Sequence, residues 1–144
     1  MSLKDIPVKL DDGAGMDETA PTGLAIALLR EVADHLLTVS QGGERQVVEL
    51  TNLPLSAGDF DLLAEKLGRG EVEANINAAG STEVFETSFP GLWWVKYLGE
   101  DGRVMTQQLE IGTVPMILEA HHEDIQASAG RFPQLFDDLD PNHH

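Results

Sequence analysis

The sequence contains no cysteine, and this absence excludes several kinds of site. Without a thiol the chain has no disulfide, no thiolate nucleophile and no cysteine-ligated iron–sulfur cluster. A structural zinc site would have to be built from histidine and carboxylate ligands alone. We therefore expect the protein to fold without metal.

Basic residues are scarce. Nine Lys and Arg stand against 25 Asp and Glu among 144 residues, which gives a formal net charge of −16. Such a chain has no basic field for binding nucleic acid or an anionic membrane surface. The same charge favours a basic protein partner, although it also keeps a protein soluble without any partner.

Long hydrophobic runs are missing as well. The longest apolar stretch, residues 23–29, is far shorter than the roughly 20 residues that cross a bilayer. Residues 1–5 lack the basic-then-apolar pattern of a signal peptide. We expect a cytoplasmic protein.

The pattern that is present begins with helices. Residues 1–20 contain five acids and no sustained period, so we expect a flexible acidic arm. An apolar stripe at helical spacing follows, which predicts a helix capped by Thr22 and ending near Ser40. A short β-branched strand comes next. Ser56 and Asp59 then form a capping box at the start of a second helix, which ends at Gly68.

Four further strands are predicted, and glycine-containing turns separate them: 71–77, 82–88, 92–98 and 103–111. Short hairpin connections require antiparallel pairing. A third helix is expected to extend to about residue 129. The fold class is therefore α+β, a single domain over residues 21–131 with an antiparallel sheet of about five strands and two or three packed helices. Residues 132–144 are expected to form an acidic, mobile tail.

The two tryptophans are adjacent on one predicted strand, so they point to opposite faces of the sheet. Trp93 shares its face with Val95 and Tyr97, which makes that face the better core face. Trp94 is then expected to point outward and to act as a protein-binding anchor. The alternative is that a terminal helix covers Trp94. Glu71 and Glu73 lie on the solvent-facing side of their strand and are candidate partner-binding residues.

The candidate metal residues are His121 and His122. Neighbouring residues on a helix point about 100° apart, so the two imidazoles do not readily share one ion. His35 has no serine or aspartate partner at a spacing that marks a catalytic triad. We predict no catalytic residue, no metal site and no cofactor.

Four motifs in order resemble a known family. They are Val48-Glu49-Leu50-Thr51-Asn52-Leu53-Pro54-Leu55-Ser56, Leu67-Gly68-Arg69-Gly70-Glu71-Val72, Glu86-Thr87-Ser88-Phe89-Pro90-Gly91-Leu92-Trp93-Trp94-Val95 and Leu109-Glu110-Ile111-Gly112-Thr113-Val114-Pro115-Met116-Ile117-Leu118. Their order and spacing are similar to those of the C-terminal conserved region of HupH, a hydrogenase expression/formation protein family. The resemblance covers about residues 46–131.

The resemblance implies a non-enzymatic assembly chaperone in nickel–iron hydrogenase maturation. Its client would be the precursor of the small, iron–sulfur-bearing subunit, which carries a basic, twin-arginine export signal, and other maturation proteins are further candidate partners. Many members of the family are about twice this length and have two related halves. A chain that matches one half is expected to rebuild the pair as a homodimer.

Two other functions stay open at this stage. One is a small metal carrier or metal-dependent enzyme that uses His121 or His122. The other is a scaffold or dimerisation module that has no client of its own.

Overall fold

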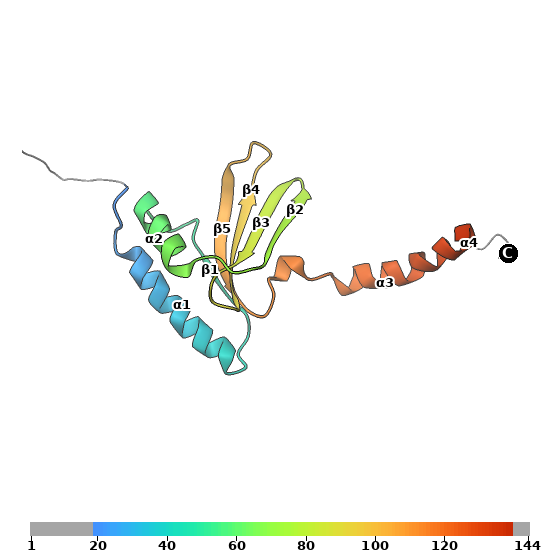
Figure 1. The fold of residues 1–144 in the computed structure, drawn as a ribbon, viewed down its shortest axis with the longest axis horizontal. Coiled ribbons are helices and arrows are strands. Elements are labelled where there is room, and N and C mark those ends of the chain that lie inside the picture. The colour runs from blue at the N-terminus through green and yellow to red at the C-terminus, as the bar shows by residue number, and fades with distance from the viewer. Residues whose placement is uncertain (1–18, 140–144) are drawn as a thin grey trace, which may run out of the picture. The chain divides into compact units, whose positions relative to one another are not determined.

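The computed structural model describes residues 19–139, and Figure 1 shows its elements. Contacts within the chain divide it into two compact units, residues 1–113 and residues 114–144. The first unit contains two helices and five strands: α1 (Leu24–Ser40), β1 (Gln46–Glu49), α2 (Ala57–Leu67), β2 (Glu73–Ala78), β3 (Gly80–Glu86), β4 (Leu92–Leu98) and β5 (Val104–Ile111).

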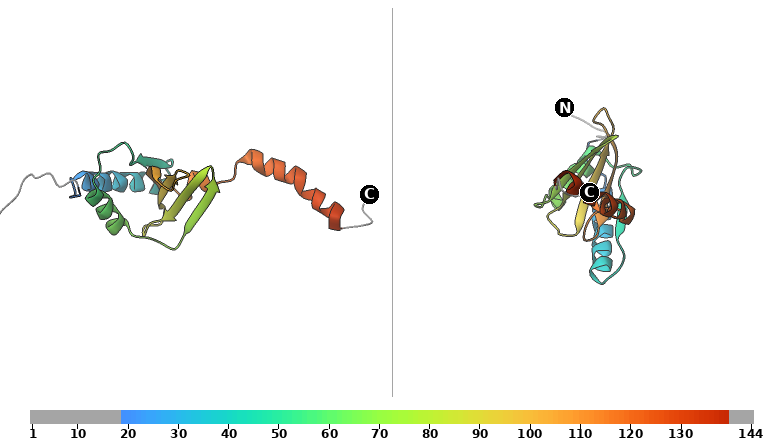
Figure 2. Two further views of the ribbon diagram at one scale, coloured as in Figure 1. Left: turned by 90° about the horizontal axis from the view of Figure 1, so that it is seen from above. Right: turned by 90° about the vertical axis from the view of Figure 1, so that its right-hand side faces the viewer.

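The five strands form one antiparallel sheet in the order β1-β5-β4-β3-β2. The helices α1 and α2 contact each other, and α1 also contacts β1 and β5 (Figures 1 and 2). The α+β class with an antiparallel five-stranded sheet is therefore confirmed. The predicted strand 92–98 is β4 to the residue, whereas the other predicted strands differ from the observed ones by one or two residues at their ends.

One face of the sheet packs against the two helices and forms the hydrophobic core. The members of this core are buried and come from α1, α2, four strands and the residue that follows β1: Ala25, Leu28, Val32, Val48, Leu50, Leu63, Leu67, Phe85, Leu92, Trp94, Leu109 and Ile111. The stripe predicted for the first helix supplies two of them, Leu28 and Val32, whereas Ala25 was not part of that stripe. Helical periodicity therefore indicated the correct buried side of α1.

The predicted capping box is present and does more than begin α2. Ser56 accepts a hydrogen bond from the Asp59 backbone N–H at 3.1 Å, and the Asp59 carboxylate accepts one from the Ser56 N–H at 3.0 Å. The same carboxylate accepts from the Thr22 backbone N–H at 2.9 Å and from the Thr22 hydroxyl at 2.6 Å. The N-cap of α1 is Gly23 and not Thr22 as predicted, although the Thr22 hydroxyl also accepts a hydrogen bond from the Leu24 N–H at 3.3 Å.

The second unit is helical. A short 3₁₀ helix, η1 (Met116–Leu118), precedes three consecutive helical segments, α3 (His122–Arg131), η2 (Phe132–Gln134) and α4 (Leu135–Leu139). Helical structure therefore continues into residues predicted as a tail, because Pro133 lies in the first turn of η2, where proline is compatible with helix. Residues 1–18 of the predicted arm and residues 140–144 lie outside the described part of the chain.

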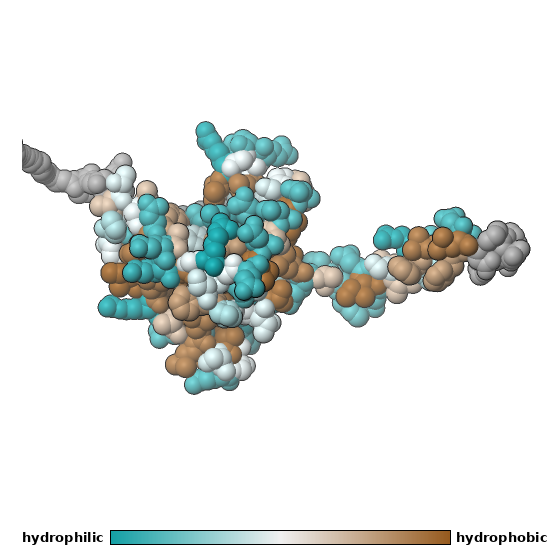
Figure 3. All heavy atoms as spheres, viewed as in Figure 1, coloured by the Kyte–Doolittle hydropathy of each residue, from teal (hydrophilic) through white to brown (hydrophobic). Residues whose placement is uncertain are grey.

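The second unit exposes an apolar stripe, which Figure 3 shows in brown along α3 and α4. Its exposed members recur at helical spacing: Ile125, Phe132, Leu135, Phe136 and Leu139. The Phe132 and Phe136 rings contact each other edge to face, with their centroids 6.3 Å apart. Among the described residues, no helix is both long enough and apolar enough to cross a membrane.

Candidate partner-binding surface

Trp94 does not point outward, and that prediction is wrong. Its side chain is 3% exposed, slightly less than the 5% of Trp93, and it belongs to the core beneath α1 and α2. Its indole N–H donates to the Gln107 side-chain carbonyl oxygen at 2.9 Å. Trp93 lies on the other face of the sheet and donates to the Gly112 carbonyl at 3.1 Å. Trp94 is therefore a core residue and offers no exposed anchor.

The reason is that β4 is a central strand whose first four residues, from Leu92 to Val95, are all buried. A strand with one solvated face shows alternating polar and apolar residues, whereas a continuous apolar run is typical of burial on both faces. The run Leu-Trp-Trp-Val in the sequence therefore indicated burial of both faces. The prediction treated only one of the two faces as buried.

Trp94 belongs to a group of two aromatic rings and two cations. Phe85 stacks on Trp94 with ring centroids 5.8 Å apart and an interplanar angle of 24°. The Arg69 guanidinium lies 3.8 Å from the centroid of the Phe85 ring, and the Lys96 ammonium lies 5.6 Å from that of Trp94. Each of the two rings thus already has a cation of this chain near its face.

Phe85, Arg69 and Lys96 were not among the site residues predicted from the sequence. The strand register provides part of the explanation, since Phe85 pairs with Trp94 and Glu83 pairs with Lys96 across β3 and β4. Alternation along the strand already predicts that Lys96 shares the face of Trp94. Arg69, however, comes from the loop after α2, and no sequence pattern indicates that it reaches the Phe85 ring.

The two predicted carboxylates lie where α2 leads into the sheet. Glu71 is exposed and precedes β2, so it is not part of the strand as predicted, and Glu73 is the exposed first residue of β2. A carboxylate oxygen of Glu73 lies 3.8 Å from an Arg69 guanidinium nitrogen. Both partners are mostly solvent-exposed, and an ion pair of this kind contributes little to stability.

Two small hollows flank Arg69. One, of about 160 Å³, is lined by Ala64, Gly68, Arg69, Phe85, Trp94 and Lys96. The other, of about 180 Å³, is lined by Arg69, Glu73, Ala74, Asn75, Glu83, Val84 and Phe85. Charged side chains thus gather around β2, β3 and the loop after α2. This region is the candidate partner-binding surface.

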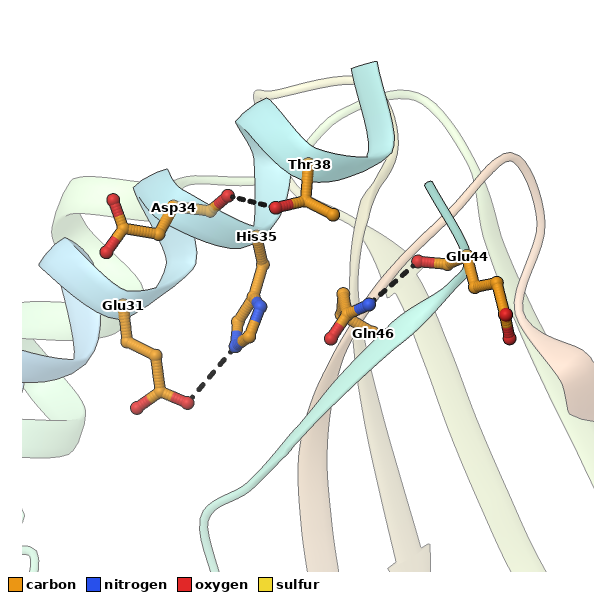
Figure 4. A network of polar contacts seen from close by, with 6 residues as sticks. All are labelled: Glu31, Asp34, His35, Thr38, Glu44 and Gln46. Carbon is orange, nitrogen blue, oxygen red and sulfur yellow. Dashed lines mark hydrogen bonds and ion pairs between the residues drawn. The ribbon is translucent and has the colours of Figure 1, made fainter. Parts of the chain in front are cut away.

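The histidines lie elsewhere. His35 is half-buried on α1, and its Nε2 lies 3.2 Å from Glu31, one helical turn away (Figure 4). The other contacts drawn there are hydrogen bonds from Thr38 to the Asp34 carbonyl and from the Gln46 amide to the Glu44 carbonyl. These contacts join residues that are two to four positions apart in the sequence, and none of them places a nucleophile next to a base.

His121 is the N-cap of α3 and His122 is its first residue, and both are exposed. In the part of the chain that the structure describes, no group of three or more His, Asp or Glu side chains is arranged to hold a metal ion. No observation therefore favours the metal-dependent alternative over the others.

Comparison with known proteins extends the resemblance noted in the sequence. A family model described as "HupH hydrogenase expression protein, C-terminal conserved region" matches residues 24–139. The chain belongs to the HupH family. The match includes α1 and continues to the end of α4, so it is longer than the segment over which the motifs were noticed.

Relatives named as hydrogenase expression/formation proteins agree with this assignment. HupQ of Azotobacter chroococcum mcd 1 is 35% identical over 94 residues, which are 65% of this chain and 33% of the relative. HupH of Rhodobacter capsulatus is 30% identical over 113 residues, which are 78% of this chain and 41% of the relative. This chain thus spans only a third to two-fifths of these HupH-type proteins.

A solved structure matches the fold. The hydrogenase expression protein HupH from Thiobacillus denitrificans ATCC 25259 aligns with a TM-score of 0.77 and 36% sequence identity. The alignment covers 83% of this chain and 99% of that one. The solved HupH structure therefore corresponds over nearly its whole length to the region seen here.

Proposed function

We propose that this chain is a non-enzymatic accessory protein of nickel–iron hydrogenase maturation that binds the precursor of the small, iron–sulfur-bearing subunit. The observation that carries this proposal is membership of the HupH family over residues 24–139. Relatives from several bacteria are named hydrogenase expression/formation proteins, and one from Escherichia coli is named a hydrogenase-1 operon protein. Those names describe the formation of another enzyme, which is the role proposed here.

Charge supports the choice of client. A chain of net charge −16 attracts a basic segment from a distance, and salt screens this attraction. Glu71 and Glu73 are exposed carboxylates on the candidate surface, and arginine binds carboxylates through two parallel hydrogen bonds. We propose that these two residues contact the basic export signal of the precursor. Trp94 is buried and does not contact the partner in this proposal; it only stacks on Phe85.

The experiment is a calorimetric titration of this chain with the small-subunit precursor, with the same precursor lacking its export signal, and with the large subunit. We expect the intact precursor to bind, its affinity to fall between about 0.05 M and about 0.5 M salt, and removal of the signal to weaken it. A double substitution, Glu71→Gln with Glu73→Gln, should weaken binding. The matched control is Glu100→Gln with Asp101→Asn, in the exposed turn between β4 and β5, which should bind like the wild type.

Equal binding of both subunits, or of neither, would contradict the proposed client. Binding that ignores both salt and the signal would contradict the electrostatic contact and leave the accessory role in place.

A further inference from the structure

Among residues 19–139, which the structure describes, the strand β2 forms one edge of the sheet and pairs with another strand on one side only. Its six residues pair with β3 in an unbroken antiparallel register, from Glu73↔Phe85 to Ala78↔Gly80. The strand at the opposite edge, β1, has only four residues. Among the described residues, β2 is thus the longer exposed edge.

The outward backbone groups of β2 follow from the hydrogen bonds around it. The Glu86 N–H donates to the Val72 carbonyl at 2.9 Å, and the Thr87 N–H donates to the Leu92 carbonyl at 2.9 Å on the other side of β3. Bonded and non-bonded pairs alternate along an antiparallel ladder. Residues 74, 76 and 78 therefore bond inward to β3, whereas Glu73, Asn75 and Asn77 direct their N–H and C=O groups outward.

Nothing in the sequence of β2 blocks a further strand. Proteins protect sheet edges with proline, lysine, bulges or very short strands. The segment Glu-Ala-Asn-Ile-Asn-Ala has none of these, whereas the irregularity in this sheet lies between β4 and β5, at Tyr97 and Leu98. An unprotected edge of this length can accept an extended peptide, which pairs through main-chain hydrogen bonds.

The two faces of the edge differ in chemistry. Glu73, Asn75 and Asn77 lie on the face that packs against the helices, because Glu73 is opposite Phe85, and Glu83 lies beside Asn75 in the register. Ala74 and Ile76 lie on the other face and are half-buried. An added strand therefore meets one carboxylate and two amides of β2 at alternate positions on one face and the apolar side chains of Ala74 and Ile76 on the other.

The charges around the edge favour a basic occupant. Glu71, Glu73 and Glu83 are exposed, and the nearby cations are Arg69, which pairs with Glu73, and Lys96, which lies over the aromatic rings. We propose that the β2 edge binds an extended segment of the client as a sixth strand, with basic side chains alternating with apolar ones. This inference rests on the proposed function and specifies how the client is held.

A second copy of this chain fits the edge less well. Two chains of charge −16 repel each other. A pair of six-residue strands whose apolar contacts come from Ala74 and Ile76 also buries far less than the roughly 1,600 Å² of a standard stable interface. Pairing of β2 with itself is therefore an outcome to be tested against the proposal.

The experiment uses the full chain and two basic peptides of identical composition. In one, arginine and valine alternate over six residues, and in the other three arginines precede three valines. We expect the alternating peptide to bind at least ten times more tightly. Hydrogen exchange should show new protection of the Glu73, Asn75 and Asn77 amides in that complex. Equal binding of the two peptides, or protection confined to other elements, would overturn the proposal.

Asn75→Pro tests the main-chain contact directly. Proline removes an outward N–H that makes no bond to β3, and proline is tolerated at such edge positions, so the fold should persist. We expect a tenfold or greater loss of affinity for the alternating peptide, whereas the control Asn75→Thr, which keeps the N–H, should bind within about twofold of the wild type. If Asn75→Pro does not fold, the exchange pattern of the wild-type complex decides. Protection of the three amides at high protein concentration without peptide would assign the edge to a second copy.

The intact precursor separates this inference from the proposed function. If the precursor binds wild type and Asn75→Pro equally well, strand addition is wrong and the accessory function stands. If the alternating peptide protects the β2 edge but no hydrogenase precursor binds, the edge is a peptide site and the proposed client is wrong.

Discussion

Among single residues, Asp59 connects two separate parts of the chain. It is fully buried, and its carboxylate receives hydrogen bonds from Ser56 and twice from Thr22, 37 residues away in sequence. Burial alone would raise the pKa of Asp59. The hydrogen bonds from the Thr22 hydroxyl and from the backbone N–H groups of Ser56 and Thr22 outweigh this effect and lower the pKa to about 2. Asp59 thus fixes the segment before α1 to the start of α2.

Replacing Asp59 should therefore destabilise the fold. Asp59→Ala removes half of the capping box and leaves the partly buried hydrogen bonds of Thr22 and Ser56 without their acceptor, so we expect a loss of about 2–4 kcal/mol in the free energy of unfolding near neutral pH. Asp61→Ala, an exposed residue of the same helix, should change it by no more than about 0.5 kcal/mol. Urea unfolding measures both variants. If Asp59→Ala were as stable as Asp61→Ala, the hydrogen bonds between Thr22 and Asp59 would not stabilise the fold.

The contribution of Asp59 should also depend on pH. Its pKa is lower in the folded state than the ordinary value of 3.8, so the folded state binds the proton less readily than the unfolded state. The stabilisation is then complete above the unfolded pKa and is lost as the pH falls through that value toward about 2. The difference in stability between wild type and Asp59→Ala should shrink over this range. A difference that stays constant down to about pH 2 would contradict this assignment.

The tryptophans give a second prediction at this scale. Both are buried, so Trp93→Ala and Trp94→Ala should each cost about 3–5 kcal/mol in the free energy of unfolding. Met105→Ala, at a side chain that is 62% exposed, should have little effect. Denaturant unfolding compares the three variants. A Trp94→Ala variant as stable as Met105→Ala would mean that Trp94 is not part of the core.

At the level of elements, the sequence predicted most of the architecture. Helical periodicity and a capping box located α1 and α2, and turns at Gly80 and Gly102, which adopt φ of 96° and 84°, separated the strands. The predictions were weakest near the C-terminus. A single helix ending near residue 129 was expected, but η1 and a break precede α3, and helical structure then passes through Pro133. Proline occurs both after the end of a helix and in the first turn of the next one. The sequence alone did not show that Pro133 belongs to the first turn of a new helical segment.

Gly68, at the end of α2, provides a test at this scale. Its φ of +66° and ψ of −167° lie in a region that is essentially restricted to glycine, and an added Cβ would collide with the Ser88 hydroxyl oxygen. Gly68→Ala should therefore lower the free energy of unfolding by about 1–3 kcal/mol. The control is Gly130→Ala in α3, where a Cβ meets no atom within 4 Å and alanine favours helix. Thermal unfolding followed by circular dichroism should separate the two, and a neutral Gly68→Ala would contradict the strain assigned to this helix end.

For the molecule as a whole, the sequence predicted the fold class but not the composition of the candidate surface. Arg69, Phe85 and Lys96 come from the loop after α2, from β3 and from β4, and the strand register together with the position of that loop brings them together. The edge position of β2 also depends on the strand order. The hairpins link β2 to β5 in sequence order, but they do not determine whether β1 pairs with β2 or with β5, and here it pairs with β5. Such relations are long-range, and local patterns do not encode them.

The absence of cysteine leads to a prediction about metals. Without thiolate ligands, a four-ligand structural site would need histidines and carboxylates that the fold brings together, and the described residues contain no such group. Thermal melts of the full chain with and without a strong chelator should therefore coincide. A fall of many degrees after chelation would support the metal-dependent alternative at His121 or His122. The predicted homodimer stays a prediction, which sedimentation at high micromolar concentration can check.

Co-purification would show directly whether this chain binds the precursor of the hydrogenase small subunit. The tagged full chain is expressed in a host that produces a nickel–iron hydrogenase, and the captured proteins are probed for the large subunit and for the small subunit with and without its export signal. The account predicts that the chain captures the unprocessed small subunit and that the Glu71→Gln, Glu73→Gln double variant captures less of it. The Glu100→Gln, Asp101→Asn control should capture as much as the wild type. Capture of the large subunit alone, or of neither subunit, would contradict the account.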